Sequence, residues 1–567
     1  MKSSIVNRII SVCLLAPAAL GLPVSAVRAQ AEPEPIPAGV APPPGPYAPG
    51  MDVLHYGLEI ALDSGDRIEG RAAIRVRLVD PVPDALLFDL TGLAVGGVTI
   101  DGARVEYELD SGRIRVPLTG VHAIGDELVV GVEYGGRPDD GLILRDNVHG
   151  ARAAFADNWP NRARFWFPSV DHPSDKATVS FTVHAPAGWR VIANGRMEGE
   201  PGPTAAGALG GGADRRTWRW RTDVPIPSYT MVVGGAPLEV REVGLGACGA
   251  APASPREDGC VLSTYWVFPA DTARAAPSFE RASEMVDFFS ELVGPFPYEK
   301  MAHVQSATRF GGMENASAIF YSESGISEGR NIEGTVSHEI AHQWFGDSAT
   351  EAEWHHLWLS EGFATYFGAL FFEHADGVEA LRERMEQNRS RYLQSGVAER
   401  PVIDESETDL FALLNANNYQ KGGWVLHMLR DLVGDVAFFA GVRSYYAEYA
   451  HSTALTADLQ RHMEAAADTD LDWFFRQWLH APGHPVLAVD WEENGQGQVT
   501  LVVEQLQPAN WPTFRFPLTV DLVDEGGDRR RERLSVEGRR EVVPISGSPP
   551  AALEVDPDGA LLKELRR

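Results

Sequence analysis

Hydrophobic and polar residues alternate along the first half of the chain, from residue 51 to about residue 240. The alternation is clearest in 56–62 and 74–78, and again in 128–134, where apolar residues occupy every second position. This spacing places the apolar side chains on one face of a β-strand. Turn signals such as Asp63-Ser64-Gly65-Asp66 separate the runs. The pattern therefore predicts an N-terminal domain built of half-buried strands.

The apolar spacing becomes helical between about residues 270 and 480. Residues 425–433 predict one helix, with Gly434 as its stop signal. Residues 457–466 predict another, with Thr456 as its N-cap. This part of the chain is therefore expected to be mainly helical.

Strand-like alternation returns after Pro485, in 499–503 and 516–522. Together with the earlier patterns it predicts a multidomain α+β protein. Residues 32–50 are rich in Pro, Ala and Gly, which is typical of a flexible linker. The predicted parts are a signal peptide (1–31), a linker (32–50), an N-terminal antiparallel β domain (51–245), a helical domain (246–484) and a small C-terminal β-sandwich (485–567).

The composition narrows the range of functions. With 567 residues the chain is too long for one hydrophobic core. Its formal net charge of −30 at pH 7 disfavours nucleic acid and anionic membrane surfaces as partners, because both are bound by clustered Lys and Arg. We read this acidity as a well-solvated exterior.

The first residues predict export. Lys2 and Arg8 precede a short apolar run, 9–22, and small residues around Ala29 and Ala31 suit cleavage. An uncleaved anchor is the alternative, but the run is short for a bilayer. No later segment reads as a membrane span, so the mature chain is expected to be periplasmic or extracellular.

Two cysteines remain after such a cleavage, Cys248 and Cys260. In an exported chain, two cysteines this close in sequence suggest one disulfide that closes a small loop. The pairing of Cys248 with Cys260 is a hypothesis from the sequence.

The chemistry centres on His338-Glu339-Ile340-Ala341-His342. Residues four apart share one helix face, so both imidazoles can bind one metal ion, and Glu339 lies beside the first of them. Glu361, after eighteen intervening residues, supplies a third ligand at the start of a second helix, with Ser360 as its expected cap. Two histidines and one glutamate suit zinc, so one Zn²⁺ per chain is predicted.

The neighbouring His355 and His356 are adjacent in sequence, so their side chains point apart. We interpret them as structural residues, or as residues that support the metal ligands, and not as ligands themselves.

Four motifs together resemble the aminopeptidase N family of gluzincin metallopeptidases. The resemblance is to a short form without the large helical C-terminal domain of many members. It implies a thermolysin-like catalytic domain for the helical part. The motifs are Gly311-Gly312-Met313-Glu314-Asn315, the metal-binding set, Asn418-Tyr419-Gln420-Lys421-Gly422, and Phe475-Arg476-Gln477-Trp478 followed by Pro482-Gly483-His484-Pro485.

The resemblance implies roles for these residues. Glu339 would act as the general base and Tyr419 would hydrogen-bond the oxyanion. The segment Gly311, Gly312, Met313, Glu314 and Asn315 would bind the substrate, with Glu314 on its free α-ammonium group. The expected substrates are therefore peptides with a free N-terminus.

One segment departs from the family pattern. Members often carry a Gln or Glu in the N-terminal domain that also contacts the substrate amine. Counting back from Arg164 places Asp157 and Trp159 there. Asp157 could replace that contact with a shorter side chain, whereas Trp159 could not act as an acid.

Two other functions remain open from the sequence. One is an endopeptidase or an epoxide-opening hydrolase of the same superfamily. The other is a peptide-binding protein with structural zinc, which Glu339 and an open fourth metal position disfavour.

Overall fold

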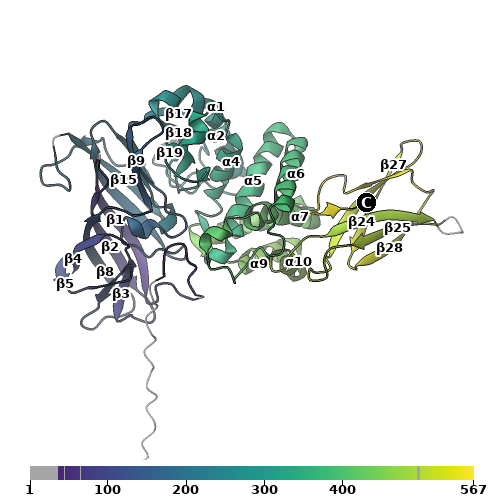
Figure 1. Cartoon of the computed structure of the whole chain (residues 1–567), viewed down its shortest axis with the longest axis horizontal. Coiled ribbons are helices and arrows are strands. Elements are labelled where there is room, and N and C mark those ends of the chain that lie inside the picture. Colours follow the sequence, from purple (N-terminus) through teal and green to yellow (C-terminus); the bar gives the residue numbers. More distant parts are fainter. Residues whose placement is uncertain (1–35, 44, 64, 213, 494–497, 567) are drawn as a thin grey trace, which may run out of the picture. The chain divides into compact units, whose positions relative to one another are not determined.

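The computed structural model describes residues 36–566, except residues 44, 64, 213 and 494–497. The predicted signal peptide lies outside these residues. The described chain begins with β-sheets, continues with a helical part and ends with further sheets (Figure 1), which is the predicted α+β fold. Within the described ranges, no helix combines the length and apolar character needed to cross a membrane.

The N-terminal β region contains a large sheet with the strand order β13-β15-β11-β1-β2-β8-β4-β5. Its predicted runs are strands, and their alternating apolar side chains are buried, as for Tyr56, Leu58 and Ile60. All pairs along this order are antiparallel except β1 with β11, which is parallel. The strands are β1 (Met51–Leu62), β2 (Ile68–Leu78), β4 (Ala94–Ile100), β5 (Ala103–Val105), β8 (Glu127–Gly136), β11 (Lys176–Pro186), β13 (Arg196–Met197) and β15 (Arg215–Pro227), with β14 (Gly202–Pro203) paired to β15.

Two smaller sheets complete this region. One has the order β12-β16-β10-β9 and the other β3-β7-β6. The loop that follows β10 carries Asp157, which is fully buried, and Trp159. The strands are β3 (Ala85–Asp89), β6 (Glu108–Asp110), β7 (Arg113–Pro117), β9 (Leu142–Asp146), β10 (Arg152–Ala156), β12 (Arg190–Ala193) and β16 (Val233–Ala236).

A five-stranded mixed sheet opens the next region, with the order β17-β18-β19-β21-β20. The short edge strand β20 pairs antiparallel with β21, Gly312 opposite Tyr321 and Met313 opposite Phe320. The strands are β17 (Glu239–Gly246), β18 (Val261–Val267), β19 (Met301–Ser306), β20 (Gly312–Met313) and β21 (Ala318–Ser322).

The helical part follows (Figure 1). Its helices are α1 (Thr272–Phe279), α2 (Ala282–Leu292), α3 (Glu323–Ser327), α4 (Glu333–His342), α5 (Trp358–Asp376), α6 (Val378–Gln394), α7 (Gly422–Val433), α8 (Asp435–Tyr449), α9 (Thr456–Ala467) and α10 (Asp472–Leu479), and β22 (Ala349–Glu351) pairs with β23 (Ser452–Ala454). Helices α4 and α5, which carry the predicted metal ligands, pack against each other.

Both sequence-predicted helices are present, and Gly434 ends α7 with a φ of 82°. The cap of α9 differs from the prediction. Thr456 is the first helical residue, and Asp458 accepts the hydrogen bond of the Leu455 backbone N–H at 2.8 Å. The Thr456 hydroxyl is engaged elsewhere, 2.8 Å from Nδ1 of His356.

The C-terminal strands form two sheets with the orders β28-β25-β24-β30 and β27-β26-β29. Alternating residues of β25 and β26 are buried, including Leu501, Val503, Leu518 and Val520. The strands are β24 (Val486–Glu493), β25 (Val499–Gln505), β26 (Phe516–Val523), β27 (Arg529–Val536), β28 (Arg540–Ile545), β29 (Ala552–Val555) and β30 (Glu564–Leu565).

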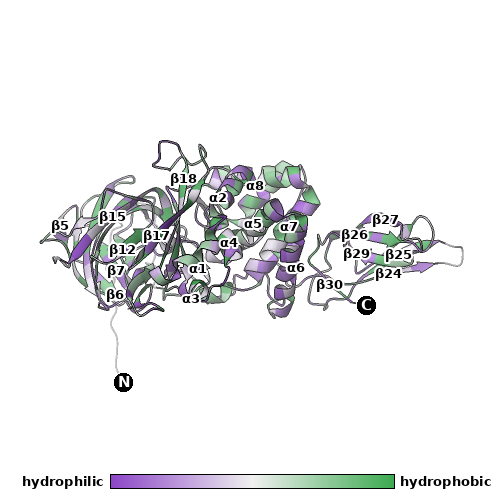
Figure 2. Ribbon diagram, turned by 90° about the horizontal axis from the view of Figure 1, so that it is seen from above, coloured by the Kyte–Doolittle hydropathy of each residue, from purple (hydrophilic) through white to green (hydrophobic). Residues whose placement is uncertain are grey.

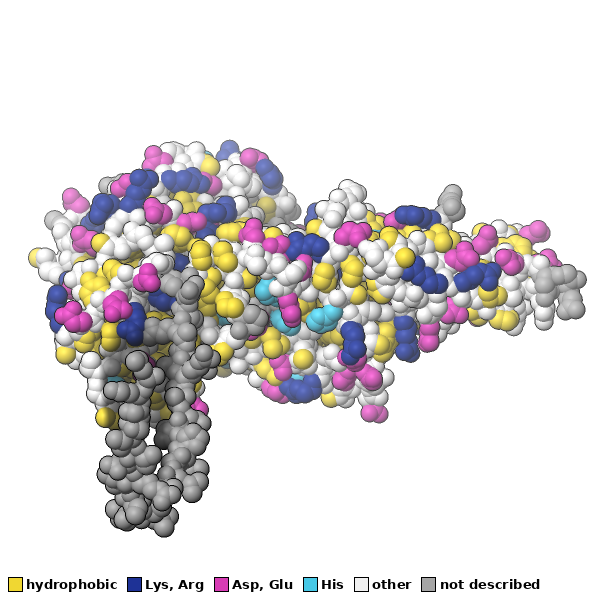
Figure 3. All heavy atoms as spheres, turned by 60° about the horizontal axis from the view of Figure 1, so that its bottom comes forward, with side chains coloured by type: hydrophobic (Ala, Val, Ile, Leu, Met, Phe, Trp, Pro, Cys, Tyr) yellow, Lys and Arg dark blue, Asp and Glu magenta, His cyan; other side chains and the backbone are white. Residues whose placement is uncertain are grey.

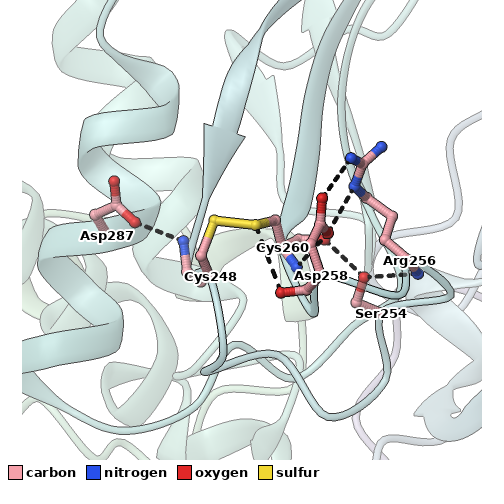
Figure 4. Close-up of a disulfide and its surroundings, with 7 residues drawn as sticks. Cys248, Ser254, Arg256, Asp258, Cys260 and Asp287 are labelled. Carbon is pink, nitrogen blue, oxygen red and sulfur yellow. Dashed lines mark hydrogen bonds and ion pairs between the residues drawn. A yellow bond between two sulfur atoms is a disulfide. The ribbon is translucent and has the colours of Figure 1, made fainter.

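The predicted disulfide is present between Cys248 and Cys260, in the connection from β17 to β18 (Figure 4). An ion pair between Arg256 and Asp258 lies inside the loop that it closes. At the base of the loop, Asp287 of α2 accepts a hydrogen bond from the backbone of Ala247. The disulfide and this bond together fix the loop to the sheet and to α2.

Candidate metal centre and active site

The three predicted metal ligands converge on one point. Nε2 of His338 lies 3.1 Å from Nε2 of His342, and Oε2 of Glu361 lies 3.2 Å and 3.3 Å from these two nitrogens. Ligand atoms around a tetrahedral zinc ion, each about 2.1 Å from the metal, are roughly 3.4 Å apart. The donor types and their spacing therefore fit zinc.

The surroundings of His342 set which nitrogen faces the metal position. Its Nδ1 lies 3.1 Å from the carbonyl oxygen of Phe345 and 3.0 Å from Oγ of Ser360. A carbonyl oxygen only accepts, so Nδ1 carries the proton and Nε2 presents its lone pair to the metal. The expectation that Ser360 caps α5 is wrong, because α5 begins at Trp358 and Ser360 instead contacts this imidazole.

Burial and charge shape the ionisation of the site. Burial disfavours the charged form of Glu361, but the imidazoles of His342 and His338 lower its pKa to about 2. For Glu339, burial raises the pKa well above its usual value; His342 acts against this, and Glu314 and Glu361 add to it. A raised pKa makes Glu339 a stronger proton acceptor when it is ionised.

Tyr419 lies beside the metal ligands. It belongs to a π-helical turn, Asn417–Lys421, a backbone form that is frequent at functional sites. Its hydroxyl donates a hydrogen bond to Oε1 of Glu361 at 2.6 Å. The close approach needs glycines, since a Cβ on Gly362 would lie 2.9 Å from the backbone carbon of Gly422.

The Gly311-Gly312-Met313-Glu314-Asn315 motif contains a steric requirement that the sequence did not reveal. A Cβ on Gly312 would lie 2.1 Å from Oε1 of Glu339. The second glycine therefore leaves the space that the carboxylate of Glu339 occupies. Gly311 has no such neighbour, because its Cβ would meet no atom within 4 Å.

The rest of this motif divides between cavity and interior. Gly311, Gly312, Met313 and Glu314 line the cavity at the metal site. Asn315 does not, because its side chain is fully buried behind them, so its predicted contact with substrate is corrected.

Glu314 is a buried carboxylate, 6 % exposed, within 4.8 Å of ligand atoms of both Glu339 and His342. Among the described residues, no Lys, Arg or His side chain forms an ion pair with its carboxylate, and the hydrogen bond that lowers its pKa comes from its own backbone. Burial raises its pKa to about 7, with His342 acting against this and Glu361 adding to it.

Asp157 is the second predicted substrate contact that needs correction. Its carboxylate is fully buried and pairs with Nη2 of Arg162 at 3.1 Å and with Nε of Arg309 at 3.2 Å. It also accepts a hydrogen bond from Oγ1 of Thr308 at 3.0 Å. Asp157 thus holds the chain that leads to β20, and Trp159 is the residue that reaches the cavity.

The two adjacent histidines behave as predicted. Nε2 of His355 lies 2.8 Å from the carbonyl oxygen of Glu407, and Nδ1 of His356 lies 2.8 Å from Oγ1 of Thr456. Neither lines the cavity. Both therefore connect segments around the site without contacting the metal position.

The cavity at the metal site has a volume of about 440 Å³. One wall comes from β20 and Trp159, and another from the facing parts of α4 and α5. A third wall, which the sequence analysis did not identify, is a face of α6 with four polar side chains: Arg384, Gln387, Asn388 and Arg391.

Two histidines four residues apart on α4, a glutamate on α5 and the buried Glu339 define the site of a zinc metallopeptidase. Residues 278–478 match the protein family described as "Peptidase family M1 domain". Residues 53–230 match the family described as "Peptidase M1 N-terminal domain". Together these matches cover more than half of the sequence, so the chain belongs to peptidase family M1.

Two relatives illustrate the range of the family. Aminopeptidase N of Streptomyces lividans is 27% identical over 438 residues, covering 71% of this chain and 48% of that protein. Leukotriene A-4 hydrolase of Xenopus laevis is 22% identical over 461 residues, covering 77% of this chain and 72% of that protein. The chain thus spans about half the length of the first relative.

A solved structure has the same architecture. The M1 zinc metallopeptidase from Deinococcus radiodurans matches with a TM-score of 0.64 and 25% identity, over 76% of this chain and 93% of that one. A variant of it bound to a Tyr-Ser-Ala substrate matches with a TM-score of 0.66 at 24% identity, over 78% of this chain and 95% of that one.

Proposed function

We propose that this protein is a zinc-dependent aminopeptidase that removes single residues from the free N-termini of peptides. The main support for this proposal is the buried carboxylate of Glu314. A buried carboxylate without a cationic partner is costly to ionise, so a bound positive charge stabilises its ionised form. The α-ammonium group of a peptide supplies that charge and places the first peptide bond beside the metal ligands.

The edge strand β20 supports the same reading. Gly312 and Met313 pair with β21 on one side only, and β20 ends the order of its sheet. A peptide can therefore add to this edge as a further strand. Glu314 follows β20 directly, so a peptide bound there reaches the carboxylate with its first residue.

The remaining groups suit hydrolysis. His338, His342 and Glu361 would hold the zinc ion, which would supply Lewis acidity for the scissile carbonyl when bound. Glu339 accepts a proton from the attacking water and passes it to the leaving amine. Tyr419 donates a hydrogen bond to the oxyanion as negative charge develops there.

The test uses a panel of aminoacyl reporter amides and one peptide in free and N-acetylated forms. We expect cleavage of free-amine substrates only, one zinc per chain by metal analysis, and loss of activity with a chelator that added zinc reverses. Cleavage of the acetylated peptide at a similar rate would refute the amine anchor and favour an endopeptidase.

Glu314→Gln tests the anchor directly, because it removes the charge and keeps the shape. We expect kcat/KM for a free-amine reporter to fall by about 100-fold, since hydrogen-bonded charge pairs contribute on the order of 1.5–3 kcal/mol. Glu353→Gln is the matched control, because Glu353 does not line the cavity. Equal losses in both variants would contradict the assignment.

We also propose that the protein is exported. The sequence of residues 1–31 supports this, and the disulfide between Cys248 and Cys260 is typical of proteins in oxidising compartments. N-terminal sequencing of the mature protein should find a start after Ala29 or Ala31. An intact Met1 in a reducing compartment would contradict export.

A further inference from the structure

The α6 wall of the cavity consists of Arg384, Gln387, Asn388 and Arg391. Spacings of three, four and seven residues place these side chains on one face of a helix. The α6 ribbon is largely hydrophilic (Figure 2). On the face shown in Figure 3, acidic and basic side chains are interspersed. The α6 wall differs, because it has two guanidinium groups and no carboxylate.

None of these four side chains has a hydrogen-bonding or ion-pairing partner within the residues that the structure describes. The guanidinium of Arg384 lies over the ring of Phe372, 3.2 Å from its centroid. The carboxylates of Glu333 and Asp376 are already paired with Arg281. Arg384 therefore faces the cavity as a charged guanidinium without a bonded carboxylate, although Glu333, Asp376 and Glu383 lie near enough to act on it electrostatically.

The other arginines of α6 are engaged differently. Arg382 pairs with Glu379 at 2.7 Å, and Arg389 pairs with Glu386 at 2.6 Å. Neither of these arginines lines the cavity. Acidic neighbours are thus available along this helix, yet the cavity-facing arginines are left without them.

The α6 wall and Glu314, the proposed binding group for the substrate amine, lie on opposite sides of the metal site. Glu314 lies next to His342, at the C-terminal end of α4. Arg384 lies next to the first turn of α4, because its Nη1 is 3.2 Å from the position of a Cβ on Gly334. Eight residues of α-helix separate Gly334 from His342, which is about 12 Å. An extended peptide rises about 3.3 Å per residue, so its third or fourth residue reaches this wall.

We propose that the α6 wall binds a carboxylate on the leaving part of the substrate, three or four residues from its N-terminus. This inference rests on the proposed aminopeptidase function and adds a substrate class to it. The carboxylate is either the C-terminus of a short peptide or an acidic side chain of a longer one. Arg384 and Arg391 supply the charge, and the amides of Gln387 and Asn388 supply further donors.

Two matched substrate pairs distinguish the sources of the carboxylate. The first pair is X-Gly-Gly and X-Gly-Gly-amide, where X is the residue that the reporter panel favours. The second pair is X-Gly-Asp-amide and X-Gly-Asn-amide. The readout is the ratio of kcat/KM between the acid and its uncharged partner, which cancels general losses of activity. We expect a ratio of about ten or more in at least one pair, as for other charge-assisted hydrogen bonds.

Arg384→Gln and Arg391→Gln should each lower that ratio toward one. Arg382→Gln removes the same charge from the same helix outside the cavity, so its ratio should stay at the wild-type value. Metal analysis and thermal melting show whether each variant is folded and loaded with zinc. Because Arg391 is exposed, its variant provides a second test if Arg384→Gln folds poorly.

The outcomes separate this inference from the function on which it rests. If the wild-type protein cleaves no reporter amide, the aminopeptidase proposal fails and this one fails with it. If reporters are cleaved but both ratios stay below two, only the carboxylate site is refuted. A ratio that survives in both cavity variants, or that falls equally in Arg382→Gln, also refutes it.

Discussion

Replacing Gly312 by alanine should separate catalysis from metal binding. The added Cβ would lie 2.1 Å from Oε1, 2.5 Å from Cδ and 2.7 Å from Cγ of Glu339. Carbon contacts are comfortable at about 3.5–4 Å, so the carboxylate must move by more than about 1 Å. Glu339 borders the cavity, so it can turn away from the reacting water.

A displacement of this size can lower a rate by about 100-fold, so we expect kcat for a reporter amide to fall by that factor. Zinc content should be unchanged, because a Cβ on Gly312 meets no metal ligand among its three nearest atoms. The matched control is Gly311→Ala, whose Cβ meets nothing within 4 Å. Its loss should be less than a tenth as large. A Gly312→Ala enzyme within threefold of the wild type, or one without zinc, would refute the reasoning.

Three further predictions concern other parts of the molecule. Tyr419→Phe removes the hydroxyl that lies 2.6 Å from Glu361 and should lower kcat by roughly 100-fold at constant zinc content. Steady-state kinetics and metal analysis test this, and an effect seen only in KM would contradict it. Burial lowers the pKa of His303 to about 3. As the pH falls below about 6.5, this histidine is therefore protonated in the unfolded chain but stays neutral in the folded one. The free energy of unfolding should consequently decrease by about 2 kcal/mol between pH 6.5 and 5. His303→Phe should therefore show a smaller fall of Tm over this range, and an equal fall would exclude the residue as a cause. Replacing both Cys248 and Cys260 by serine should lower the free energy of unfolding by roughly 2–3 kcal/mol in denaturant titrations and leave kcat unchanged. A decrease below about 0.5 kcal/mol, the size of an ordinary surface substitution, would mean that the loop is held without the disulfide.

Local spacing was sufficient for much of the fold. The strands β1, β2, β8, β25 and β26 follow from a period of two, and α7 follows from helical spacing and its glycine stop. These features depend on neighbouring residues only. Both predicted caps were wrong, because the hydroxyls of Thr456 and Ser360 contact the side chains of His356 and His342 instead of their own helix ends.

The metal ligands could also be found from the sequence. His338 and His342 are held in register by a single helix, and the spacing to Glu361 allows a connection and a second helix that returns alongside the first. The substrate contact predicted for Asp157 by its position before Arg164 was wrong. Its partners Thr308 and Arg309 lie 151 and 152 residues away in the sequence. Nothing local in the sequence indicates that pairing.

The sequence by itself thus predicted many of the strands and helices, the three candidate metal ligands and Glu339 as the proposed general base. The strands and helices follow from short repeats, and the histidine pair follows from helical spacing. Only the tertiary structure decided what surrounds them. It set Gly312 against Glu339, buried Asp157 in favour of Trp159, and turned the polar face of α6 into the cavity. The physical reason is that these contacts join separate elements, and their distances are set by how sheets and helices pack.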